Sequence, residues 1–189
     1  GNVGQSGADT PGPEAANEGV QQNISVSGWP RSVRWTEFRE LSNRPSGANE
    51  DAQVGTETAP DSPVTVRQGG QWMLAELVLQ IVVNRTNSWV VTSRKSAALR
   101  AHEQGHFDIH GIIVGRDLVA ELRAIRARSN RALGVAIRRK KRQAMRRGQR
   151  MTNTYDEDTN HGLDTARQAA WEQQIRNAID NNIRLTTPD

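Results

Sequence analysis

Two histidines and a glutamate stand at a spacing that could bind and use a metal ion. They form His102-Glu103-Gln104-Gly105-His106, an H-E-x-x-H motif, within a stretch of helical periodicity. Histidines at i and i+4 lie one turn apart on one helix face, so both imidazoles can reach one Zn²⁺. Glu103 then stands beside the metal, placed to take a proton from a metal-bound water. The motif predicts a zinc-dependent hydrolase with two histidine ligands and a glutamate general base.

A catalytic zinc needs a third protein ligand and one open position. His110 lies on the same predicted helix, but a rise of about 12 Å separates it from the first histidine of the motif. It could join the site only if the helix breaks. Glu121 also continues that helix, whereas Glu172 falls on the last predicted helix and His161 in a polar loop predicted over 154–162. The spacing leaves these candidates open, with His110 as the less favoured one.

Three further residues are candidates for supporting roles around the metal. Asp108 lies two positions beyond His106, on a different helix face, so it could orient a ligand imidazole or anchor the following loop. Tyr155 could donate a hydrogen bond to the oxyanion of a tetrahedral intermediate, with packing or loop anchoring as its alternative. Asp156 could bond to His161 or cap the loop.

Alternating hydrophobicity predicts the strands that must support the motif. From Trp72 to Val83 the odd positions are apolar, which indicates a half-buried strand with the odd residues on the core. Residues 88–91 are interpreted as the return strand of a hairpin. Val33–Phe38 and Val64–Val66 are shorter strand candidates, and the polar stretch Ser42–Ser62 is typical of a loop.

Capping residues and apolar spacing predict the helices. Ser93 or Ser96 can cap a helix that carries the motif and continues to Ile125. A basic helical segment over 116–150 follows, and a last helix spans about Asp164 to Ile179. The expected fold is α+β and zincin-like, with a small antiparallel sheet or hairpin packed on the motif helix, a long following helix and a C-terminal helix.

Composition suggests how the chain divides. Residues 1–27 have little to bury and are interpreted as a disordered leader or linker. Residues 28–183 are expected to form one domain, and 184–189 a tail. The longest apolar run, Leu77–Val83, is too short for a bilayer span. The 189-residue chain has no cysteine, which excludes disulfides and thiolate ligands.

Positive charge is concentrated in one segment. The net charge is +4, yet residues 116–150 carry 13 basic and 2 acidic side chains. Within them, Arg138–Arg150 holds 8 basic residues and no aromatic one. Without stacking groups or a recognised motif, nucleic acid is an unfavoured partner. A solvated helix face, or binding to an anionic surface of the bacterial envelope, explains the segment better.

Several blocks of this sequence resemble a bacterial domain family of unknown function whose members are described as secreted zinc-dependent proteases. They are Trp35-Thr36-Glu37-Phe38, Ser88-Trp89-Val90, Leu99-Arg100-Ala101-His102-Glu103-Gln104-Gly105-His106-Phe107-Asp108-Ile109, Tyr155-Asp156-x-x-Thr159-x-His161-Gly162 and Gln168-x-x-Trp171-x-x-x-Ile175. The resemblance covers about residues 33–180. It implies a zincin-like fold, zinc held by His102, His106 and His161, and a periplasmic or secreted location, although no signal peptide is visible at Gly1.

The sequence therefore favours a zinc metallopeptidase that hydrolyses peptide bonds of an unidentified protein or peptide substrate. The alternative is a non-catalytic module of the bacterial envelope that holds zinc or binds an anionic surface. Glu103 argues against a purely structural zinc site, since such a site gains nothing from a carboxylate at that position.

Overall fold

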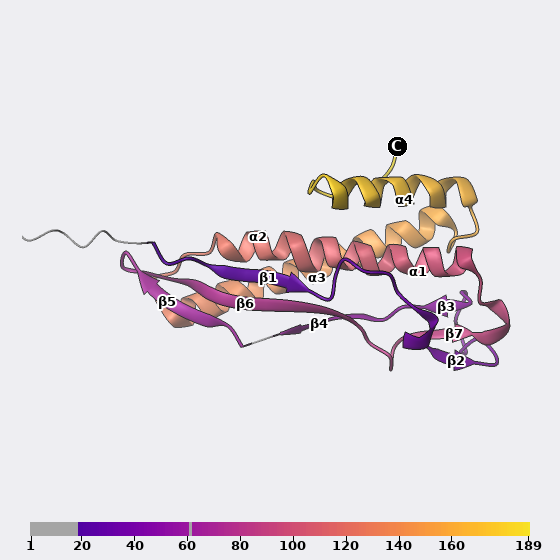
Figure 1. Cartoon of the computed structure of the whole chain (residues 1–189), viewed down its shortest axis with the longest axis horizontal. Helices are drawn as coiled ribbons and strands as arrows, with labels where there is room; N and C mark the ends of the chain where they lie inside the picture. The colour runs from indigo at the N-terminus through magenta and orange to yellow at the C-terminus, as the bar shows by residue number, and fades with distance from the viewer. Residues whose placement is uncertain (1–18, 61) are drawn as a thin grey trace, which may run out of the picture.

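A 13-residue strand, β6 (Gln71–Val83), is the centre of the larger of two sheets in the computed structural model, which describes residues 19–60 and 62–189. The strands β1 (Asn23–Ser27), β4 (Thr56–Pro60) and β5 (Val64–Gln68) all pair with it (Figure 1). β1 runs parallel to β6, while β4 and β5 run antiparallel to it. The predicted alternation of β6 holds from Leu77 to Ile81, where the odd positions are buried and Gln80 is exposed, but Leu74, at an even position, is also completely buried.

The second sheet corrects two strand predictions. It contains β2 (Arg39–Leu41), β7 (Trp89–Val91) and β3 (Ala52–Gln53) in the order β2-β7-β3. β7 is therefore not the return strand of a hairpin with β6. All three of its residues are buried, so it occupies the middle of its own sheet. Residues 33–38 are not a strand either, because none of them is extended in a sheet and a 3₁₀ turn (η1, Trp35–Glu37) occupies half of the stretch.

Both sheets are mixed, rather than antiparallel as the sequence predicted. The parallel pairs are β1 with β6 and β2 with β7. β1 also corrects the prediction for residues 1–27, since Asn23–Ser27 is a strand with Ile24 completely buried, whereas residues 1–18 lie outside the described residues. Likewise, the predicted loop over 42–62 contains β3 and β4.

One continuous helical rod carries the H-E-x-x-H motif along the sheets. It consists of α1 (Ala97–His110), a π-helical segment η3 (Gly111–Asp117) and α2 (Leu118–Arg123). Ser96, one of the two predicted caps, accepts a hydrogen bond from the backbone N–H of Leu99. On the sheet-facing side, Phe107 is completely buried in a cluster with Val90 of the smaller sheet and Ile81 of the larger. The motif helix is thereby fixed against both sheets.

Two further helices complete the fold. α3 (Asn130–Thr159) follows the turn after α2, and α4 (Thr165–Asp180) packs on α1 and α3 on the side away from the strands (Figure 1). Asp164 caps α4, close to its predicted start. The polar loop predicted over 154–162 is wrong for most of its length, because α3 continues to Thr159 with Tyr155 completely buried.

The last residues also belong to the packed structure. After α4 the chain is non-helical, yet Leu185 is buried in the main core. Arg116 of η3 donates hydrogen bonds to the backbone carbonyls of Ala178 and Ile183, which ties the end of the chain to the central rod. In the part of the chain that the structure describes, no helix is both long and apolar enough to cross a membrane.

Candidate metal centre

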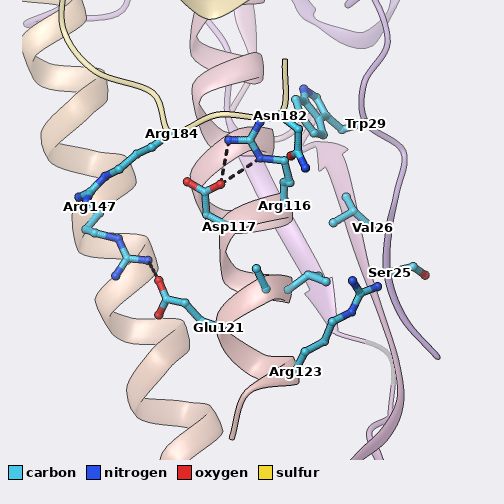
Figure 2. A pocket seen from close by; sticks show the side chains of 12 residues that line it. Ser25, Val26, Trp29, Arg116, Asp117, Glu121, Arg123, Arg147, Asn182 and Arg184 are labelled. Atoms are coloured by element: carbon cyan, nitrogen blue, oxygen red, sulfur yellow. Dashed lines mark hydrogen bonds and ion pairs between the residues drawn. The ribbon is translucent and has the colours of Figure 1, made fainter. Parts of the chain in front are cut away.

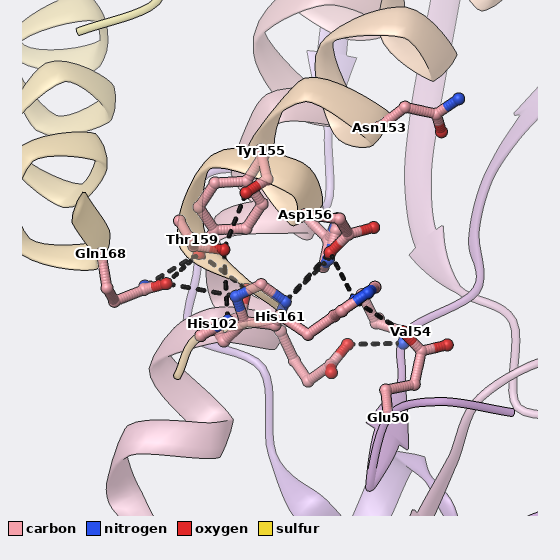
Figure 3. A network of polar contacts seen from close by, with 12 residues as sticks. Glu50, Val54, His102, Asn153, Tyr155, Asp156, Thr159, His161 and Gln168 are labelled. Carbon is pink, nitrogen blue, oxygen red and sulfur yellow. Dashed lines mark hydrogen bonds and ion pairs between the residues drawn. The ribbon is translucent and has the colours of Figure 1, made fainter. Parts of the chain in front are cut away.

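Side chains from α1 and α3 converge on one point (Figure 3). The Nε2 atoms of His102 and His106 lie 3.2 Å apart. Oδ1 of Asp156 lies 3.1 Å from the first of these nitrogens and 2.9 Å from the second. These three atoms form one of two groups in the described residues that could hold a metal ion.

The spacing of these three atoms fits the ligands of one tetrahedral zinc. Ligands at zinc distances of about 2.0–2.2 Å stand about 3.3–3.6 Å from one another, so the observed separations need to open by only a few tenths of an ångström. The donor set of two imidazoles and one carboxylate suits zinc. The residues present therefore fit a zinc ion.

The far side of the His102 ring is held by a side chain that the sequence did not assign a role. Oε1 of Gln168, on α4, lies 3.1 Å from Nδ1 of His102. An amide oxygen can only accept, so this bond requires a proton on Nδ1 and leaves the lone pair of Nε2 free. Gln168 thereby selects the tautomer in which His102 can bind a metal through Nε2.

Tyr155 packs against His102, the first histidine of the motif, and its hydroxyl does not face the cleft-lining side chains. Its ring stacks on His102 with centroids 4.7 Å apart and planes 16° apart. Its hydroxyl is buried between the carbonyl oxygen of His102 and the amide of Gln168. Burial raises the pKa of this hydroxyl far above its usual value. The structure thus matches the packing alternative for Tyr155 and places no oxyanion donor there.

The same ring explains the glycine inside the motif. A Cβ atom at Gly105 would lie 2.2 Å from the hydroxyl oxygen of Tyr155 and 2.5 Å from its Cζ. Real carbon contacts are much longer, so any side chain at this position has to displace the buried ring. Gly105 lets α3 approach α1 closely enough for Asp156 to reach the histidines.

Glu103 lies beside the trio of His102, His106 and Asp156 and is almost completely buried, with 2% of its surface exposed. Its Oε2 accepts a hydrogen bond of 2.7 Å from the backbone N–H of Val54, between β3 and β4. Burial raises the pKa of this carboxyl although His106 and His102 oppose the shift. A raised pKa makes Glu103 a stronger base than an exposed glutamate.

Asp156 and His106 shift each other's pKa. Burial opposes ionisation of Asp156, but its contacts with His102 and His106 hold its pKa well below the usual range. Burial also opposes protonation of His106, yet the charges of Asp156 and Glu103 raise its pKa. These shifts favour an ionised Asp156 carboxylate beside a protonated His106 imidazole.

The structure brings Asp156, and not His161, into contact with both histidines of the motif. Nδ1 of His161 lies 3.6 Å from Oδ1 of Asp156 and 3.4 Å from Oε2 of Glu50. This residue follows the end of α3 in a left-handed conformation with φ of 53°. The trio and His161 therefore meet only through Asp156.

The other sequence candidates lie away from the trio. His110 contacts Thr58 of β4 at 2.9 Å, and burial lowers its pKa to about 4. Asp108 accepts a hydrogen bond of 2.9 Å from the indole of Trp29, so it anchors the segment after β1 and does not orient a ligand imidazole. Burial raises its pKa to about 6. Glu121 is paired with Lys140 and Arg147.

A cleft of about 630 Å³ opens onto the candidate centre. His106, Glu103 and Asp156 form part of its floor, and residues 52–56 of the β3–β4 segment run along it. Gln149, Thr152 and Asn153 of α3 line another part of the wall. The cleft is large enough for a short stretch of polypeptide or another small polar substrate.

A second and larger cleft of about 760 Å³ lies between β1, the central rod and α3 (Figure 2). Its lining includes four arginines, Arg116, Arg123, Arg147 and Arg184. The first three of them bond to Asp117, to the carbonyl of Ile24 and to Glu121, respectively. No residue of the H-E-x-x-H motif lines this cleft, so the smaller one is the candidate reaction site.

The part of the chain that carries the site is similar to a bacterial family model whose function is not known. Residues 84–162 match a family model described as "Bacterial protein of unknown function (DUF922)". The match covers less than half of the chain, but it includes the motif, Asp156 and His161. No curated protein and no solved structure matches the chain.

Two polar residues at the site carried no assigned role in the sequence. Gln168 stands in the block Gln168-x-x-Trp171, but nothing in its type or spacing indicates that it bonds to a histidine 66 positions away. Glu50 lies in a stretch whose composition is typical of a loop, and such a stretch carries no periodicity that would show which way a side chain faces.

Proposed function

We propose that this chain is a zinc-dependent hydrolase, and that its substrates are peptides. The observation that carries the proposal is the convergence of His102, His106 and Asp156 within 3.2 Å, with Glu103 beside them on the floor of a cleft. In this arrangement the two Nε2 atoms and Oδ1 of Asp156 would hold the metal. The resemblance of the motif blocks to a family described as secreted proteases supports a peptide substrate and a location outside the cytoplasm.

The chemistry divides between the ion and the protein. A zinc ion, when bound, polarises a carbonyl oxygen and brings the pKa of water to about 7. Glu103 takes up the proton of the attacking water on its carboxylate and passes it to the leaving nitrogen. The N–H of Val54 fixes one of its oxygens at 2.7 Å, which leaves the other for the proton. Burial of Glu103 excludes competing water and raises its basicity.

The shape of the cleft favours an extended chain as substrate. β3 stands at the edge of the smaller sheet, and the segment from β3 into β4 runs along the cleft that contains Glu103. An edge strand offers unpaired backbone groups to which an extended polypeptide can add. A peptide bound in this way would pass over the floor of the cleft where the three ligands meet.

Replacing Glu103 by glutamine tests the proposal. Zinc-loaded wild type is expected to cleave members of a peptide library, read out by mass spectrometry, and Glu103→Gln is expected to lose this turnover by about 10²- to 10⁴-fold. Glu103→Gln should still hold zinc, since the carboxylate is not a ligand. Glu76→Gln, on the exposed face of β6, is the matched control and should remain active. Undiminished turnover in Glu103→Gln, or no cleavage by zinc-loaded wild type, contradicts the proposal.

A second candidate function rests on α3. On its exposed side stand six arginines for which no ion pair with a described residue is found, together with two exposed apolar side chains. They are Arg131, Arg138, Arg139, Arg142, Arg146 and Arg150, with Val135 and Met145. A basic helix face with apolar side chains suits an anionic surface. Binding to vesicles with anionic lipid that weakens with salt, and is lost in Arg142→Glu/Arg146→Glu but kept in Glu103→Gln, would support this function.

A further inference from the structure

A second group of potential metal ligands lies directly beside the trio. It consists of Glu50, Asp156 and His161, whose ligand atoms all lie within 4.8 Å of one another. They come from the loop between β2 and β3, from the last turn of α3 and from the turn after it (Figure 3). Asp156 belongs to both groups, so its carboxylate is the point at which they adjoin.

The imidazole of His161 faces two carboxylates without bonding to either. Its Nδ1 is buried and makes no hydrogen bond with the described residues, although it lies 3.4 Å from Oε2 of Glu50 and 3.6 Å from Oδ1 of Asp156. These separations are too long for good hydrogen bonds. They agree with the spacing of about 3.3–3.6 Å between ligands of one tetrahedral zinc.

Backbone geometry holds His161 in this orientation. His161 has φ of 53°, and its N–H donates a 2.9 Å hydrogen bond to the carbonyl of Asp156. Gly162, with φ of 80°, closes the turn through a bond from its N–H to the hydroxyl of Thr159. Left-handed non-glycine residues cost free energy and persist only where the surroundings fix them. The turn therefore presents the ring to the carboxylates as a fixed ligand.

We propose that Glu50, Asp156 and His161 form a second divalent-cation site, and that the carboxylate of Asp156 bridges it to the site of the two motif histidines. One imidazole and two carboxylates suit zinc. In two-metal hydrolases the two ions stand about 3.5–4 Å apart. The exposed edge of His161, with 37% of its side chain accessible, gives the ion a path from solvent. The inference rests on the proposed metal centre, because the two sites share Asp156.

Metal stoichiometry tests this inference on the full chain. Metal-free protein is titrated with Zn²⁺ by calorimetry, and bound zinc is counted by elemental mass spectrometry after gel filtration. Wild type is expected to bind two ions per chain, and Glu50→Gln and His161→Asn one each. Asn suits the His161 position because it tolerates a left-handed backbone. Glu40→Gln, whose carboxylate pairs with Lys95 away from the centre, is the control and should bind two.

The outcomes separate this inference from the proposed function. One ion in wild type, kept in Glu50→Gln and lost in His106→Ala, overturns the second site and leaves the hydrolase proposal standing. Loss of all zinc in folded Glu50→Gln also overturns it, because the two groups would then form a single site. No zinc in folded wild type overturns both. Cobalt provides an independent readout, since two bridged Co²⁺ ions should couple magnetically in wild type and not in His161→Asn.

Discussion

Replacing Gly105 by alanine should destabilise the protein, against the normal preference of helices. In a helix interior, alanine is more favourable than glycine by about 1 kcal/mol. Here the new methyl group would meet Tyr155, at 2.2 Å from the hydroxyl oxygen and 2.5 Å from Cζ. The ring has little room to move, because His102 stacks on it at 4.7 Å and Trp171 packs edge-on at 5.4 Å.

The expected size follows from these opposing effects. Forcing an extra methyl into a well-packed core costs about 1–3 kcal/mol, and more where the neighbour cannot shift. With the helix gain of about 1 kcal/mol subtracted, Gly105→Ala should lower the free energy of unfolding by up to about 2 kcal/mol. Gly134→Ala is the matched control. Its new Cβ would meet only the end of the Arg138 side chain, at 3.4 Å, so this variant should gain up to about 1 kcal/mol.

Urea unfolding of the metal-free protein, followed by circular dichroism, measures both changes. Working without metal removes the contribution of ligand binding to apparent stability. The displaced ring should also disturb His102, so Gly105→Ala is expected to bind zinc more weakly than Gly134→Ala does. If Gly105→Ala is as stable as Gly134→Ala, then Tyr155 does not pack against α1 as described, and the account of the motif glycine is wrong.

Three further predictions concern the surroundings of the centre. Burial lowers the pKa of His110 to about 4, against about 6.5 in the unfolded chain. The neutral imidazole therefore contributes stability that is fully present above pH 6.5 and is lost as the pH falls towards 4. This loss lowers the free energy of unfolding by up to about 3 kcal/mol. His110→Gln keeps a partner for Thr58 and should flatten this dependence in urea unfolding at pH 7 and 4.5; an unchanged slope speaks against a buried neutral imidazole. Gln168→Ala should weaken zinc binding about 10- to 100-fold, measured in competition with a chelator, because Nδ1 of His102 loses its hydrogen-bond acceptor. An unchanged zinc affinity would show that Gln168 does not orient His102 for the metal. Chelation of zinc should lower the melting temperature of wild type more than that of His106→Ala, which lacks the ion of the two motif histidines, and an equal drop in both would place the stabilising ion elsewhere.

The elements with strong local signals could be predicted from the sequence. The alternation in β6, the cap at Ser96 and the cap at Asp164 are local features, and each marks its element well. The pairing of β7 could not be predicted in the same way. A strand of three buried residues carries no information about its partners, which depend on tertiary packing such as that of Val90 with Phe107 of α1.

The polar composition around Asp156, the proposed third ligand, concealed its place on a helix. The string from Thr154 to Gly162 is polar, and polar strings are typical of loops. Only Tyr155 and Thr159, one turn apart, continue the narrow buried stripe that begins at Leu133 and Ile137. That stripe was the available signal that α3 extends through Asp156. Glu50 and Gln168 reach the centre through tertiary packing alone, so no local pattern could assign them.

Anomalous scattering at the zinc edge, from crystals of the zinc-loaded chain, would show whether His102, His106 and Asp156 bind one ion as proposed. We expect a peak about 2.0–2.2 Å from both Nε2 atoms and from a carboxylate oxygen of Asp156. A peak held by His102, His106 and His161 with Asp156 turned away would contradict it. The absence of any peak at the motif in well-ordered, zinc-saturated crystals would do the same.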